Sequence, residues 1–208
     1  MEATLPRPDA ADGREDPGKL GLWLFIVSEV LLFGGLFASY FMTRWGSDVC
    51  RLGSPAWPEG TAKTTLLLAA LNTVILLSSS YTVVRSLLAA RRGQRDGFLR
   101  NMGATVALAA GFLVVKGFEY SIKVHHGFTP GGAFAMANPG YRVFFSYYFL
   151  MTGLHGVHVV VGMIWNALLM ASKDGGSPGF PRKVEFAALY WHFVDVVWVF
   201  LFPLFYLV

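Results

Sequence analysis

The chain has 208 residues, of which 54% are hydrophobic and only 14% are charged. A soluble domain of this size needs a more highly charged surface, so the composition argues against a soluble protein and favours an integral membrane protein. The formal charge is +4, but lysine and arginine occur in short clusters between long apolar runs. This pattern argues against nucleic acid as a partner.

Five apolar runs follow a polar N-terminal segment. Residues 1–19 mix acids, bases, proline and glycine without the order of a cleaved signal peptide, which predicts a disordered cytoplasmic tail. A helix needs roughly 20 apolar residues to span a bilayer core about 30 Å thick. Residues 20–208 therefore form one transmembrane domain, with spans at about 20–42, 65–88, 102–124, 143–170 and 184–208. The runs are longer than the strands of a membrane β-barrel, so the predicted fold class is an all-α bundle of five transmembrane helices.

The distribution of basic residues predicts the orientation of these spans, because cytoplasmic ends of spans are enriched in lysine and arginine. Eleven of the 17 basic residues fall on the side of the N-terminus and five on the other side, while one, Lys116, lies within the third span. The N-terminus is therefore predicted to be cytoplasmic and the C-terminus to lie outside, in the periplasm.

Ionisable residues inside the spans are the first candidates for a functional site, because such residues usually face protein or water. At a rise of about 1.5 Å per residue, Glu29 lies roughly 14 Å into the first span. His155 and His158 fall near the midplane in the fourth span. His192 and Asp195 lie roughly 12–17 Å into the fifth. Each of these pairs is spaced i and i+3, on one helix face. We hypothesise that some of these five side chains meet in the bundle interior.

Two interpretations of this buried polar cluster remain open. The favoured one is a satisfied structural network that holds the helices together. The alternative is a proton-handling role, because carboxylates inside membranes often mark proton relays.

The third span carries a second polar pair, Lys116 and Glu119, again at i and i+3. The pair lies in the outer half of the span, roughly 21–26 Å from its start. We expect an ion pair or a lysine that extends toward the interface, with a functional role as the alternative.

The sequence contains no self-sufficient active site. It has five histidines and one cysteine, and it lacks the Glu-x-x-His motif of a di-iron bundle, a phosphate loop and a nucleophile elbow. We therefore predict no catalytic residue, no metal ligand and no cofactor in this chain. Haem ligation by one or two histidines stays open, and so does a small transporter or channel, which broken helices would favour.

Five sequence blocks occur in a recognisable order. They are a Ser-Glu helix (LWLFIVSEVLLFGGLFASYF, 22–41), an Asn-Thr helix (LNTVILLSSSYTV, 71–83), GFEY (117–120), a Thr-Gly-x-His-Gly-x-His helix (FFSYYFLMTGLHGVHVVVGM, 144–163) and YWHFVDVVWVFLFPLFYLV (190–208). Together they cover nearly the whole chain after residue 19. In this order they resemble subunit III of the haem-copper respiratory oxidases, the cytochrome c oxidase subunit III family.

The resemblance implies a non-catalytic accessory subunit of a proton-pumping terminal oxidase, which reduces oxygen to water with electrons from cytochrome c. It implies that catalytic subunit I and further oxidase subunits are partners, and that these partners hold the haem and copper. It also implies contact with membrane lipid, including bound phospholipid, and a location in the bacterial inner (plasma) membrane. Glu29 maps onto the family's carbodiimide-reactive glutamate, and His192 and Asp195 map onto its buried histidine and aspartate. Subunit III of a quinol oxidase and the accessory protein of nitric oxide reductase are the alternatives within the family.

The chain also departs from longer members of this family. They have seven helices, and this chain begins where their third helix begins, so one wall of their lipid cleft is absent from it. Lys116 occupies a position where members of the family often have glutamine. Whether this helical turn has the role that it has in those members therefore stays open.

Overall fold

The computed structural model describes residues 17–46, 63–132 and 139–207. These residues form α1 (Pro17–Gly46), α3 (Lys63–Arg91), α4 (Arg95–His125), α6 (Pro139–Ala171), the short 3-10 helix η1 (Lys173–Gly176) and α7 (Phe180–Tyr206). Five of the helices are long and apolar enough to cross a membrane. The predicted all-α fold class is therefore confirmed, while the cytoplasmic location of the N-terminus stays a prediction.

The helices extend beyond the predicted spans. α1 begins at Pro17, inside the predicted tail, whose residues 1–16 lie outside the described part of the chain. α4 begins at Arg95, seven residues before the predicted start. Hydropathy reports only the part of a helix that lies in the hydrocarbon layer, whereas backbone hydrogen bonding continues through the charged first turns of α4.

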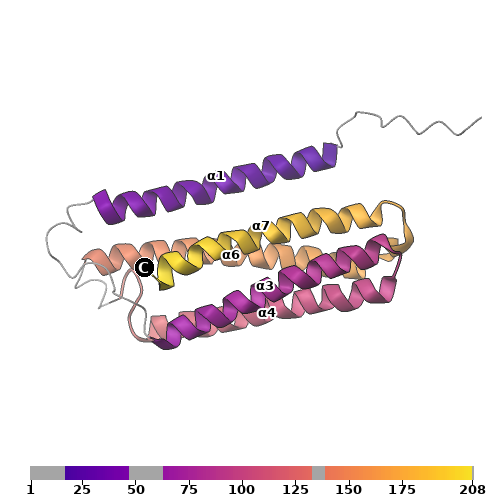
Figure 1. Cartoon of the computed structure of the whole chain (residues 1–208). Helices are drawn as coiled ribbons and strands as arrows, with labels where there is room; N and C mark the ends of the chain where they lie inside the picture. Colours follow the sequence, from indigo (N-terminus) through magenta and orange to yellow (C-terminus); the bar gives the residue numbers. More distant parts are fainter. Residues whose placement is uncertain (1–16, 47–62, 133–138, 208) are drawn as a thin grey trace, which may run out of the picture.

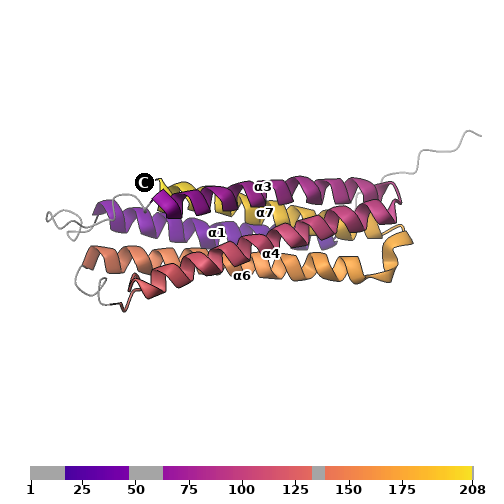
Figure 2. The same cartoon turned by 90° about the horizontal axis from the view of Figure 1, so that it is seen from below.

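α7 is the central helix of the bundle. It packs against α3, α6 and α1, while α3 also packs along α4 and α4 along α6 (Figures 1 and 2). Fifteen of the 27 residues of α7 are buried. α1 lies to one side of the other four helices and buries only Phe33 and Tyr40. α1 is therefore the least firmly packed of the five helices.

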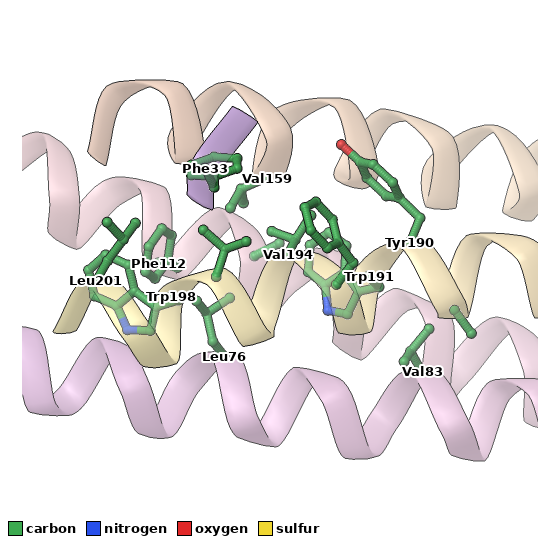
Figure 3. Packing of buried hydrophobic residues seen from close by; sticks show 14 of the residues in the cluster. Phe33, Leu76, Val83, Phe112, Val159, Tyr190, Trp191, Val194, Trp198 and Leu201 are labelled. Atoms are coloured by element: carbon green, nitrogen blue, oxygen red, sulfur yellow. The ribbon is translucent and has the colours of Figure 1, made fainter. Parts of the chain in front are cut away.

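Two tryptophans of α7 form the middle of the core and bond to α3 (Figure 3). Trp191 Nε1 donates a hydrogen bond to Ser79 Oγ at 3.0 Å, and Trp198 Nε1 donates to Thr73 Oγ1 at 3.1 Å. Within a bilayer, apolar burial drives helix association only weakly, so packing and interhelical hydrogen bonds become the main sources of stability. These two bonds fix the register between α3 and α7.

Gly162 lets α6 approach α7 closely. A Cβ atom at this position would lie 2.8 Å from two ring carbons of Trp191 and 3.0 Å from the ring of Tyr190. Two other glycines of α6, Gly153 and Gly156, have no such close neighbour. The close packing of α6 on α7 at this point therefore requires residue 162 to lack a side chain.

The turn from α3 to α4 is closed by a glycine in the left-handed conformation. Gly93 has φ +68°, and its N–H donates to the carbonyl of Ala90. The N–H of Gln94 donates to the carbonyl of Ala89. This pattern is the Schellman C-cap, which satisfies carbonyls at the end of α3 and reverses the chain within a few residues.

Arg95 joins this turn to the loop between α6 and α7. Its Nη2 donates to the carbonyls of Met170 at 2.9 Å and Ser172 at 2.7 Å, which lie at the end of α6. The guanidinium group also lies over the rings of Phe98 and Phe180. One arginine thus fixes this end of the bundle through bonds to helix-terminal carbonyls.

Candidate functional site

The first polar group in the membrane joins α1 to α6. His158 Nε2 and Glu29 Oε2 are 3.0 Å apart, and both side chains are mostly buried. His158 Nδ1 lies 2.8 Å from the carbonyl oxygen of Leu154. The ring of Phe33 packs edge-on against the imidazole. Two of the five predicted cluster residues therefore meet directly, across the interface of the least firmly packed helix.

The hydrogen bonds of this pair imply that it holds one transferable proton. A carbonyl oxygen only accepts, so Nδ1 of His158 carries a hydrogen and donates to Leu154. The bond between Nε2 and Glu29 then needs a second hydrogen, which comes either from a protonated carboxyl group or from the imidazolium. In both cases the pair is neutral overall, which lowers the cost of placing it in the membrane.

The second polar group joins α7 to α3. His192 Nδ1 lies 2.6 Å from Ser80 Oγ. Asp195 is buried, and neither of its carboxyl oxygens has a direct hydrogen bond to a described residue. The hydroxyl of Ser80 also lies near that carboxyl group. Ser80 therefore lies between the two predicted residues of α7.

His155 is separate from both groups. Its side chain is fully enclosed, stacked on Trp198 with 5.3 Å between ring centroids and packed edge-on against Phe112. Neither ring nitrogen has a hydrogen-bond partner among the described residues. The structure thus places His155 in an aromatic slot, without a direct bond to the other four predicted residues.

The outer-half pair belongs to a larger network around Glu119. Lys116 Nζ lies 3.0 Å from Glu119 Oε2. Glu119 Oε1 accepts hydrogen bonds from Tyr206 at 2.6 Å and Tyr148 at 2.7 Å, and it lies 3.2 Å from Lys123 Nζ. This Glu119 network joins α4, α6 and α7, and both oxygens of its carboxylate are satisfied.

Aromatic rings compensate the second positive charge of the Glu119 network. Lys123 Nζ lies 4.0 Å from the ring centroid of Tyr148, and Lys116 Nζ lies 4.8 Å from that of Trp198. Cation–π attraction is strongest where water is excluded. Two buried lysines are therefore held by one carboxylate and the faces of the surrounding rings.

Sequence reasoning missed several members of these groups. Lys123 was expected to be one of the basic residues at the outer end of a span, but its side chain is buried in the Glu119 network. Its i, i+4 spacing from Glu119 was the available signal. Ser80, Tyr148 and Tyr206 carry no such signal, because their partners lie on other helices.

The described residues include no group of three or more His, Cys, Asp or Glu side chains that could hold a metal ion. The buried amides of Asn72 and Asn166 also have no described hydrogen-bond partner. Buried polar groups of this kind are usual sites for internal water.

Comparisons with known proteins give a consistent result. The sequence profile described as "Cytochrome c oxidase subunit III" matches residues 14–208. The cytochrome c oxidase subunit 3 of Corynebacterium diphtheriae is 35% identical over 203 residues, covering 97% of this chain and 93% of that protein. That of Thermostichus vulcanus is 32% identical, with 99% and 94% covered. The quinol oxidase subunit 3 of Bacillus subtilis is also 32% identical, with 88% and 83% covered.

Proposed function

Because the chain belongs to the cytochrome c oxidase subunit III family, we propose that it is a non-catalytic accessory subunit that stabilises the catalytic subunit of a proton-pumping oxidase and supports its proton uptake. The observation that carries the proposal is the match over residues 14–208, which includes all five membrane helices. The chain is a multi-pass membrane protein, and we place it in the bacterial plasma membrane with haem and copper in partner subunits.

The arrangement of polar groups supports a stabilising role. The Glu119 network ties α4, α6 and α7 together, and Ser79, Ser80 and Thr73 bond α3 to α7. Charged groups held in this way favour one arrangement of the helices. A rigid bundle of this kind can support the membrane helices of a larger subunit.

The Glu29–His158 pair supports the part of the proposal that concerns protons. One proton of the pair can lie on the carboxyl oxygen or on the imidazole nitrogen, and the net charge of the pair stays zero in both forms. The pair lies between α1 and α6, away from the central helix α7. A pair of this kind can deliver a proton to a neighbouring uptake path without reorganising the bundle.

Substituting Glu29→Gln tests this role, because the amide keeps a hydrogen-bonding group but cannot transfer a proton. We expect the complex to assemble normally and proton uptake per turnover to slow. The matched control is Ser39→Ala, which removes the 2.7 Å bond between Ser39 and Tyr147 across the same helix interface and should leave proton uptake unchanged. Unchanged uptake in Glu29→Gln, or equal loss in both variants, would leave only the structural role.

Cytochrome c is the electron donor that we propose, because two relatives that align with this chain over more than 90% of both lengths are named cytochrome c oxidase subunits. A relative named as a quinol oxidase subunit has similar identity, so the donor requires a direct test. Oxidation of reduced cytochrome c by the purified complex supports the proposal. Oxidation of quinol alone would assign the chain to a quinol oxidase.

A further inference from the structure

Most of the polar groups within the membrane are enclosed by this chain. Glu29 and His158 bond to each other, and the Glu119 network satisfies its own carboxylate. His155 and Asp195 are buried. His192 differs, because its ring is partly exposed and its Nε2 has no hydrogen-bond partner among the described residues.

His192 lies at the depth where an unpaired polar atom is most costly. It is near the middle of the 27-residue helix α7, and therefore near the bilayer midplane. Lipid tails offer no hydrogen bond there. Ser80 already occupies Nδ1, so a partner for Nε2 must come from outside the described chain.

The surface around His192 is an open face of α3 and α7. Val196 and Val199 follow His192 along one side of α7 and are 53% and 45% exposed. Leu77 and Val84 flank Ser80 on α3 and are exposed at 52% and 38%. We call these five residues, His192, Val196, Val199, Leu77 and Val84, the α3–α7 face. It consists of apolar side chains around one polar atom, which suits a partner helix better than bulk lipid.

We propose that the α3–α7 face is the docking surface for a transmembrane helix of another oxidase subunit, whose hydroxyl, amide or carboxyl side chain bonds to His192 Nε2. This inference rests on the proposed function, since it requires a second subunit. Beyond the proposed function, the inference names the face of the chain that the second subunit covers and the hydrogen bond at the centre of that contact. Ser80 acts as a positioning residue, because its bond to Nδ1 sets the orientation of the ring.

Photocrosslinking in the assembled complex tests the docking surface. Benzoylphenylalanine would replace Val196 or Val199, and for the control it would replace Val161 or Leu168, exposed residues of α6. After irradiation, mass spectrometry identifies the attached molecule. We expect a crosslink to a membrane segment of another subunit from α7 and at least several-fold less from α6. Crosslinks only to lipid or to a second copy of this chain, or equal yields from both helices, would overturn the proposal.

A second measurement tests the contact itself. His192→Phe keeps the volume of the ring but loses its hydrogen bonds, whereas His192→Gln keeps a hydrogen-bonding group. We expect roughly three- to tenfold weaker retention of the chain in the detergent-solubilised complex for His192→Phe, and recovery for His192→Gln. Equal retention of both variants would contradict the contact. If the unaltered chain purifies without any haem-containing subunit, the proposed function itself fails. A crosslink to another subunit from α6 instead of α7 would contradict only the assigned face.

Discussion

Substitution of Gly162 by alanine is the sharpest test of how the bundle is packed. The added Cβ would lie 2.8 Å from two ring carbons of Trp191, about 0.7 Å closer than the ~3.5 Å at which carbon atoms attract best. Trp191 is fully buried and held by its bond to Ser79. It has no room to turn aside, so α6 and α7 must separate.

Overpacking of this kind costs about 1–3 kcal/mol, which is a roughly 5- to 150-fold change in the unfolding equilibrium. Thermal unfolding of the detergent-purified protein, followed by the fluorescence of its six tryptophans, which include Trp191, measures the effect. The control is Gly156→Ala on the same helix, where a Cβ meets no atom within 4 Å, and it should unfold like the unaltered protein. Equal unfolding temperatures for the two variants would refute the close approach at residue 162.

Three further substitutions test the polar contacts. Tyr206→Phe removes one hydrogen-bond donor to Glu119 and should lower the free energy of unfolding by about 0.6–2 kcal/mol. Glu119→Leu leaves Lys116 and Lys123 buried without a carboxylate and should lower it by about 3–5 kcal/mol. Denaturant titration compares the two variants, and equal losses would contradict a network centred on Glu119. Arg95→Lys replaces the planar guanidinium group, which bonds to the carbonyls of Met170 and Ser172, by a single ammonium group. Because one ammonium group reproduces this geometry less well, we expect faster protease cleavage in the loop at residues 172–179. A digestion time course identical to that of the unaltered protein would show that the two carbonyl bonds do not hold this loop.

The sequence was sufficient to predict the five helices, because length and apolarity alone determine which segments can cross a bilayer. The Lys116–Glu119 pair was also predictable, since both residues lie on one helix and their spacing sets their proximity. Helix ends were less predictable. The charged first turn of α4 lies outside the apolar run by which the span was recognised.

Contacts between helices were the part that the sequence could not determine. Glu29 and His158 were both recognised as buried polar residues, but which of the histidines would meet Glu29 depends on the rotation of α6. The same rotation puts His155, three residues away, against Trp198 instead of a polar partner. Whether the five inner residues act in proton transfer or only in packing stays a prediction.

Affinity purification of the chain from gently solubilised membranes, with haem spectra and mass spectrometry of the bound proteins, tests the central claim most directly. The account predicts that the chain is recovered together with a haem-containing membrane subunit, and that the haem signal stays with that subunit when the two are separated. Recovery of a folded chain alone, or of a chain that keeps the haem itself, would contradict it.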